Sequence, residues 1–153
     1  MAFISLEAPN KLQDFCGREI GVTGWFELSQ EHINRFADAT EDHQWIHVDA
    51  ARAQRDSPYG VTIAHGFLTL SLLSRFLREV LEVRGLRMAI NYGLNRVRFP
   101  SAVCAGSRVR ARIVLQSVRE LTDAVEAIYL ITVETERSDK PCCVAEWLVR
   151  YYG

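Results

Sequence analysis

The second half of the chain alternates apolar and polar residues with a period of two, the pattern of strands that bury one face. In one further run, 90–99, the apolar residues have even numbers up to Leu94 and odd numbers after it. We therefore expect a bulge or bend near Asn95 in that strand. Polar turn residues between the runs favour antiparallel pairing. The three regular runs are 109–115, 125–133 and 143–151.

The first half of the chain contains two segments with helical periodicity. Ile33, Phe36 and Thr40 recur on one face after Ser29, a residue type that favours the N-cap position. This spacing predicts a short amphipathic helix that ends near Thr40. The segment from Gly66 to about Leu81 is apolar on almost every side, as in a helix surrounded by protein.

These elements fit a single α+β domain over residues 1–153. An earlier strand over 23–28, with its aromatic residues, brings the sheet to about five strands. A sheet with one apolar face must cover that face, and the helix that begins at Gly66 is the only segment apolar enough to do so. We therefore expect a mostly antiparallel sheet wrapped around one long central helix.

Composition narrows the possible partners and the compartment. The 18 basic and 19 acidic residues nearly cancel, which gives no general electrostatic reason to expect nucleic acid or an anionic membrane as partner. No apolar run approaches the roughly 18 residues that indicate a membrane span. The N-terminus shows no secretory signal, so a cytoplasmic location is the default expectation. The four cysteines form no Cys-x-x-Cys pair, and we expect reduced, packed thiols.

Two polar side chains stand in a connection that has no periodicity. Asp42 follows the first helix, and His47 precedes Asp49, which favours the N-cap of another short helix, so we expect both in a loop. Residues 64–67, Ala-His-Gly-Phe, then open the apolar helix. A carboxylate and an imidazole can move a proton, and an amide at a helix N-terminus can hold a developing oxyanion. The pattern indicates acid–base chemistry.

Two separated motifs carry a family resemblance. They are 42–49, Asp-His-Gln-Trp-Ile-His-Val-Asp, and 63–73, Ile-Ala-His-Gly-Phe-Leu-Thr-Leu-Ser-Leu-Leu. Together they resemble the MaoC-like dehydratases of the hot-dog fold, which include the (R)-specific enoyl-CoA hydratases, and they look closest to the nodulation protein N branch. The resemblance runs from about residue 15 to the C-terminus. It implies a homodimer of hot-dog fold that acts on acyl-CoA in fatty acid metabolism, and the chemistry of that reaction requires no metal or redox cofactor.

The resemblance also implies a role for particular residues. The catalytic carboxylate and histidine fall on Asp42 and His47, and the amide that holds the thioester carbonyl falls on Gly66. A supporting serine of the central helix falls on Ser74. The implied reaction is hydration of a trans-2-enoyl-CoA to the (R)-3-hydroxyacyl-CoA, or the reverse dehydration, with the Asp/His pair activating water.

The sequence departs from the family pattern in two places. Glu41 replaces the usual glycine before the aspartate, and Gln44-Trp45 replaces the Asn-Pro of the better-known hydratases. Trp45 is expected to alter the wall of the pocket. Two rival functions therefore stay open: an acyl-CoA thioesterase with a similar carboxylate, and a protein that binds acyl thioesters without catalysis.

Several of these residues also have a purely structural interpretation. His65 lines the pocket or bonds a neighbouring carbonyl, and Ser74 supports the site or bonds the Leu70 carbonyl. Asn95 lies at the substrate site or only fixes the bend. His43 and His47, four residues apart, suggest a metal, but no third ligand stands out. A group of arginines forms a solvated strand face or receives the phosphates of coenzyme A: Arg96, Arg98, Arg108, Arg110 and Arg112.

Overall fold

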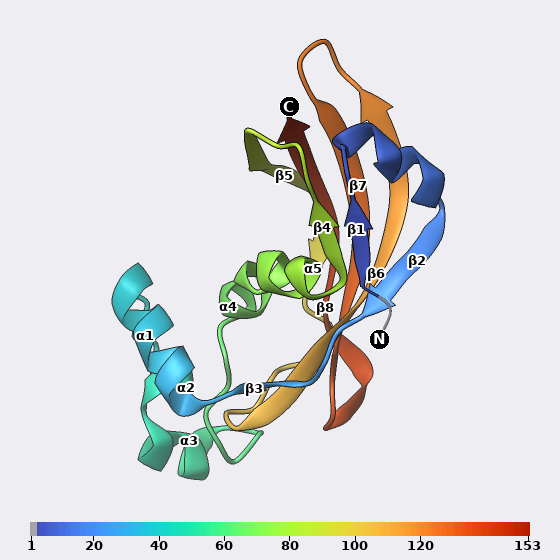
Figure 1. Cartoon of the computed structure of the whole chain (residues 1–153). Helices are drawn as coiled ribbons and strands as arrows, with labels where there is room; N and C mark the ends of the chain where they lie inside the picture. Colours follow the sequence, from blue (N-terminus) through green and yellow to red (C-terminus); the bar gives the residue numbers. More distant parts are fainter. Residues whose placement is uncertain (1–2) are drawn as a thin grey trace.

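The computed structural model describes residues 3–153; Met1 and Ala2, part of the N-terminal stretch considered for a secretory signal, lie outside the described residues. An antiparallel six-stranded sheet runs in the order β2-β6-β7-β8-β5, with β3 also paired to β6 (Figure 1). A separate parallel pair joins β1 to β4. The strands are β1 (Ile4–Leu6), β2 (Arg18–Val22), β3 (Phe26–Leu28), β4 (Leu81–Val83), β5 (Met88–Arg98), β6 (Ser107–Glu120), β7 (Val125–Thr135) and β8 (Ser138–Tyr152).

The helices form two groups. In Figure 1, α4 and α5 lie against the sheet, whereas α1, α2 and α3 gather beside it at the end where β3 lies. Their bounds, with one 3-10 helix, are η1 (Pro9–Phe15), α1 (Gln30–Thr40), α2 (Trp45–Val48), α3 (Ala50–Asp56), α4 (Gly66–Ser71) and α5 (Leu73–Val80). Across residues 3–153, no helix combines the length and the apolar character needed to cross a membrane.

The predicted sheet and central helix are confirmed, but the helix is neither continuous nor apolar all round. Leu72 separates α4 from α5, because its amide bonds the carbonyl of Thr69, three residues back, in a tightened turn. The helical segment also ends at Val80, since β4 begins at the next residue. Phe67 is 70% exposed, so one side of α4 is not covered within the chain.

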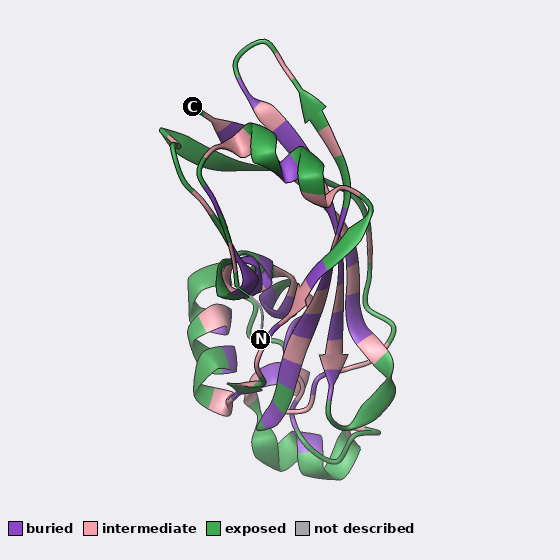
Figure 2. Cartoon of the chain, turned by 45° about the vertical axis from the view of Figure 1, so that its right-hand side comes forward, coloured by how far each residue is buried: buried purple, intermediate pink, exposed green. Residues whose placement is uncertain are grey.

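The core lies between the α4–α5 segment and one face of the sheet. Alternate residues of β6, β7 and β8 point into it, and Figure 2 shows the resulting purple and pink bands along these strands. Phe76 and Val80 of α5 are fully buried. A Cβ on Gly21 of β2 would lie 2.8 Å from Cγ1 of Val80, so only glycine lets this strand approach the helix so closely.

Strand β5 has the predicted bulge. Its pairing with β8 shifts register between Leu94 and Arg96, which places the irregularity at Asn95, and shifts once more at Tyr92. The strand is at the edge of the sheet, because β8 is its only partner among the described strands. Its length of 11 residues leaves a long free edge with several large apolar side chains at 41–53% exposure: Met88, Ile90, Tyr92 and Leu94.

Helix α1 begins and ends with residues that the sequence singles out. The hydroxyl of Ser29 accepts a hydrogen bond from the amide of His32, which confirms the predicted N-cap. Glu41 ends the helix in the left-handed conformation, with φ 59°. Glycine adopts this conformation at little cost, whereas a residue with a Cβ is strained by about 1 kcal/mol. The glycine that is usual before the aspartate in the family that the sequence resembles would avoid this backbone strain.

Replacing Glu41 with glycine is expected to stabilise the protein by up to about 1 kcal/mol, because the left-handed strain disappears. Thr40→Gly, one residue earlier in helical conformation, is the matched control and should destabilise by about 0.5–1 kcal/mol. The free energy of unfolding, measured by urea denaturation, tests the pair. Equal destabilisation by both variants would contradict the strain at Glu41.

Candidate active site

Asp42 and His47 lie in the chain segment that links α1 to α3. Asp42 follows the left-handed residue Glu41, as expected, and its side chain is 54% exposed. His47, in contrast, is buried and belongs to the one-turn helix α2 rather than to a loop. The sequence prediction missed this helix because a single turn leaves no periodic signal. The predicted N-cap at Asp49 is confirmed, since its carboxylate accepts from the amide of Arg52.

The ring of His47 is fixed from the segment that precedes α4. Its Nδ1 lies 2.7 Å from the carbonyl oxygen of Ile63. A carbonyl can only accept, so Nδ1 carries the proton and Nε2 keeps its lone pair. Two further bonds hold the same turn: the Ile63 amide donates to the Ile46 carbonyl at 3.0 Å, and Gln30 Nε2 donates to the His47 carbonyl at 2.8 Å.

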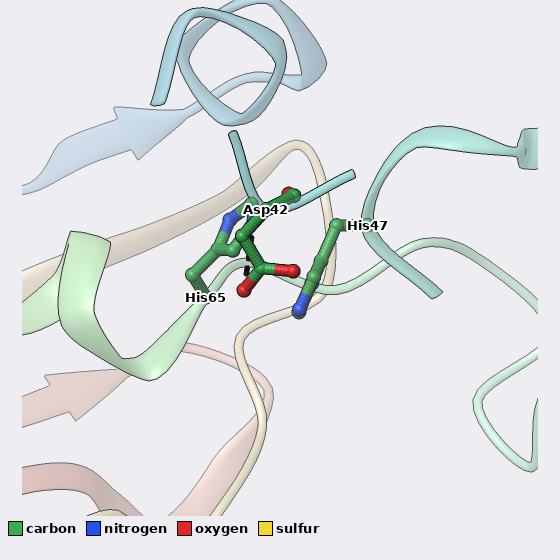
Figure 3. A group of neighbouring side chains, drawn as sticks. All are labelled: Asp42, His47 and His65. Atoms are coloured by element: carbon green, nitrogen blue, oxygen red, sulfur yellow. Dashed lines mark hydrogen bonds and ion pairs between the residues drawn. The ribbon is translucent and has the colours of Figure 1, made fainter. Parts of the chain in front are cut away.

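His65 lies next to His47 and is only 4% exposed. Its Nε2 donates to the main-chain carbonyl of Asp42 at 3.0 Å, so the expected bond to a neighbouring carbonyl is present. Its ring stacks on that of His47, with centroids 3.7 Å apart and planes at 25°. Figure 3 shows the Asp42 carboxylate between the ends of the two imidazoles.

The surroundings of His47 keep its imidazole neutral. Burial lowers the pKa of His47 below the ordinary histidine value, and the nearby His65 acts in the same direction. The Ile63 carbonyl and the Asp42 carboxylate raise the pKa but do not reverse the shift. His43 differs, because its hydrogen bond to Asp38 raises its pKa at an exposed position. His47 therefore presents a neutral Nε2 near neutral pH.

A metal ion has a third candidate ligand that the sequence did not suggest. Asp42, His47 and His65 each offer a ligand atom, and these atoms lie within 4.8 Å of one another. However, His65 Nε2, 3.9 Å from Asp42 Oδ2, already donates to the Asp42 carbonyl. His43, the other residue considered, bonds Asp38 instead. The donor set thus offers two ready ligands, fewer than the three protein ligands of a typical catalytic zinc site.

Gly66 and His47 line the same pocket, which has a volume of about 300 Å³. Gly66 is the first residue of α4. A Cβ at this position would lie 3.1 Å from ring carbons of Phe99, tighter than ordinary contacts. Phe99, at the end of β5, therefore packs over Gly66 as part of the pocket wall. This close contact is a packing reason for glycine at this position, in addition to the amide role that the resemblance implies.

The pocket also contains a buried thiol. Cys142 lines it, is 1% exposed and donates from Sγ to the Val133 carbonyl at 3.3 Å. Burial raises the pKa of Cys142 to about 12. The four cysteines are all unpaired, as the sequence predicts. Cys142 is therefore a protonated packing residue and not a nucleophile.

Three predicted site residues lie away from this pocket. Trp45 packs under the guanidinium of Arg52, with its ring centroid 4.4 Å from Cζ. Ser74 lines a larger apolar cavity of about 540 Å³ with Trp147, and its expected bond to the Leu70 carbonyl is not found among the described hydrogen bonds. Asn95 lies at the bulge of β5, beside Glu126 of the outer sheet face. The geometry gathers Asp42, His47, His65 and Gly66 only.

The arginine group divides into two sets. Arg108, Arg110 and Arg112 each pair with a glutamate: Glu136, Glu134 and Glu19, respectively. They therefore fit the interpretation of a solvated strand face. Arg96 and Arg98 of β5 form no ion pair within residues 3–153. Within this group, Arg96 and Arg98 are the two side chains left to bind a phosphate.

The residues that support the site carry no sequence signal of that role. Gln30 bonds the His47 carbonyl and also accepts from the buried Thr62 hydroxyl, which ties α1 to the segment before α4. Phe36 packs against the ring of His65 at 5.0 Å. Gln30 and Phe36 belong to α1 and Thr62 to a loop, and none of the three is part of a recognisable motif. Their spacing along the chain gives no signal of their contact.

The pKa values of His47 and His43 are expected to lie on opposite sides of the ordinary histidine value. His47 should protonate below pH 6.5, because burial disfavours the imidazolium, and His43 should protonate above it, because Asp38 stabilises the charge. Since unfolded His47 binds a proton more readily, its contribution to stability is present above pH 6.5 and declines as the pH falls through that value. Histidine side-chain NMR during a pH titration measures both pKa values; the reverse order would contradict the described contacts.

Comparison with known proteins finds relatives that cover most of the chain. The chain is 51% identical over 148 residues to 3-hydroxyacyl-thioester dehydratase Z of Mycobacterium tuberculosis, covering 96% of the chain and 97% of the relative. It is 48% identical over 134 residues to nodulation protein N of Rhizobium meliloti, covering 86% and 83%.

Two solved structures share the fold. A monoamine oxidase regulatory protein from an Archaeoglobus species superposes with a TM-score of 0.78 at 20% identity, covering 99% of this chain and 98% of that one. The (R)-hydratase from A. caviae gives 0.68 at 23%, covering 88% and 94%. The architecture is thus the hot-dog fold. The model of the MaoC like domain matches residues 11–136, and the chain belongs to this family of hydratases and dehydratases.

Proposed function

We propose that this MaoC-type hydratase or dehydratase interconverts trans-2-enoyl and (R)-3-hydroxyacyl thioesters, with Asp42 and His47 activating the water molecule. The observation that carries the proposal is the placement of the Asp42 carboxylate beside the His47 ring, whose Nδ1 proton is held by Ile63. Ligand atoms of these two residues lie within 4.8 Å, a gap that one water molecule can bridge.

The hydrogen-bond acceptors of the site fit the activation of a water molecule. The carboxylate of Asp42 and the neutral Nε2 of His47 are both acceptors, so a water between them can donate one proton to each. As the water oxygen bonds the β-carbon of the enoyl group, one of these residues takes its proton. The same proton is then delivered to the α-carbon. The sum is addition of H and OH across the double bond, which needs no redox partner.

Gly66 supports the other end of the reaction. Negative charge develops on the thioester oxygen while the β-carbon is attacked, and a main-chain amide can stabilise that charge. Gly66 lines the His47 pocket, and we assign its amide this role. Removal of such a donor typically costs about 3–4 kcal/mol of transition-state stabilisation.

The two rival functions differ in what they do with the same thioester. A thioesterase would direct water to the carbonyl carbon and release the free thiol. A binding protein would do neither, and this alternative depended on Trp45 altering the pocket wall. Trp45 packs under Arg52 and is absent from the residues that line the His47 pocket, which favours the catalytic alternative.

We further propose that the protein is a homodimer joined along β5. The free edge of β5 carries unpaired main-chain groups, and pairing two copies about a twofold axis would satisfy them. The strand also exposes apolar side chains in alternation, including Ile90 and Leu94 at 41% each. Burial of these side chains would supply the hydrophobic part of the interface.

Crotonyl-CoA distinguishes the three functions. We expect its enoyl absorbance to fall without release of thiol, and expect Asp42→Asn and His47→Gln each to reduce kcat by two or more orders of magnitude, about 100-fold at least. His43→Gln, an exposed histidine of the same segment, is the control and should stay close to the unmodified enzyme. Thermal unfolding shows whether the variants remain folded.

Other outcomes of the crotonyl-CoA assay would support a rival function or refute the assignment of a residue. Release of coenzyme A thiol would support the thioesterase, and binding without turnover would support the third function. Near-normal rates in either the Asp42 or the His47 variant would refute the assignment of that residue.

A charge on the free edge of β5 should prevent dimer formation. Leu94→Lys is expected to shift the protein from dimer to monomer at micromolar concentration, because burial of a charged side chain in the apolar seam is unfavourable. Val61→Lys, with a similar exposure of 39% but outside β5, is the matched control and should remain a dimer. Light scattering after size-exclusion chromatography gives the mass. A monomeric unmodified chain, or a dimeric Leu94 variant, would contradict the β5 interface.

A further inference from the structure

One buried histidine of the site takes no part in the reaction as proposed. His65 is 4% exposed, less than His47 at 7%, and the proposed water activation assigns acceptor roles to Asp42 and His47 alone. Its Nε2 donates to the Asp42 carbonyl, and its Nδ1 is buried without a hydrogen-bond partner among the described residues. A buried imidazole with one unsatisfied nitrogen is costly, so its retention needs an explanation.

The contacts of His65 explain that cost. One face of the ring stacks on His47 at 3.7 Å, and Phe36 of α1 packs against it at 5.0 Å. The ring therefore lies between α1 and α2, while its single N–H holds the main chain of Asp42. His65 contacts both groups assigned to catalysis and yet leaves their reactive atoms free.

The two histidines are fixed in opposite tautomers. His47 donates from Nδ1 to Ile63, and His65 donates from Nε2 to Asp42. Both acceptors are main-chain carbonyls, so neither bond can reverse. Each bond also crosses between the same two segments, 42–47 and 63–65. Together they set the position of the carboxylate against the position of the ring.

We propose that His65 is a positioning residue of this site: its N–H fixes the Asp42 backbone and its ring orients the His47 imidazole by stacking. The inference rests on the proposed function of Asp42 and His47. It makes His65 responsible for alignment, and gives it no contact with the substrate.

Protonation of His65 would oppose this role. A second proton would enter at Nδ1, which has no acceptor, and would place a positive charge against the stacked ring that must itself exchange protons. The other titratable groups that face the pair are Asp42, and Tyr59 and Cys142 in the pocket wall. The positioning role therefore belongs to the ring that carries a single proton, on Nε2.

Two variants separate the ring from the N–H. His65→Phe keeps a flat ring for stacking but removes the donor, whereas His65→Gln keeps a donor and removes the ring. We expect each to lower kcat by about 10- to 100-fold with little change in KM, because misplacement of a catalytic group by about 1 Å costs on that order. Both variants also remove the second imidazole, so the acidic limb of the pH profile of kcat/KM should move to higher pH.

The controls distinguish alignment from stability. His43→Gln should retain kcat within about threefold of the unmodified enzyme. Asp42→Asn measured in the same assay shows whether the proposed function holds at all. If Asp42→Asn is inactive while both His65 variants keep full kcat and an unshifted acidic limb, the positioning role is wrong and the proposed function stands.

A measurement on the unmodified protein avoids any problem of folding in the variants. Long-range proton–nitrogen NMR correlations of histidine side chains identify tautomers directly. We expect neutral His47 with the proton on Nδ1 and neutral His65 with the proton on Nε2. A neutral His65 with its proton on Nδ1 would overturn the proposal whatever the activity assay shows.

Discussion

The site depends on two side-chain-to-main-chain hydrogen bonds that cross between distant parts of the chain. His47 donates to Ile63, and His65 donates to Asp42, so each of the two segments supplies one donor and one acceptor. Because both acceptors are carbonyls, the bonds determine which nitrogen of each ring carries a proton. Removing either bond would leave a buried polar group unpaired, which costs about 1–3 kcal/mol. Geometry and protonation state are therefore fixed by the same contacts.

The sheet and the central helix give these bonds a rigid frame. The segment that bears Ile63 and His65 leads into α4, which packs on β8, and its Ile63 forms a bridge with Cys104 at the start of the β6 region. The segment that bears Asp42 and His47 is joined to α1 through Gln30, and to residues 63–65 through the bonds of Ile63 and His65. The pocket thus takes one part of its wall from α4 and β8, through Gly66 and Cys142, and another from α2, through His47.

The sequence predicts those parts of the molecule that repeat a pattern. Alternation identifies β6, β7 and β8, and the change of parity identifies the bulge at Asn95. The two motifs locate Asp42, His47 and Gly66, which the structure brings to one place. The break at Leu72 and the single turn of α2 escaped prediction, because each is a local hydrogen-bonding choice with no periodic signature. The placement of Trp45 depends on Arg52, a contact that spacing alone does not reveal.

The protonated state of Cys142 has a chemical consequence for the pocket it lines. An enoyl thioester is an electrophile at its β-carbon, and a thiolate in contact with it would add there and block the enzyme. Because burial raises the pKa of Cys142 to about 12, the thiol is protonated at neutral pH. Its hydrogen is further engaged by the Val133 carbonyl. Burial of this sulfur thus protects the protein from alkylation by its own proposed substrate.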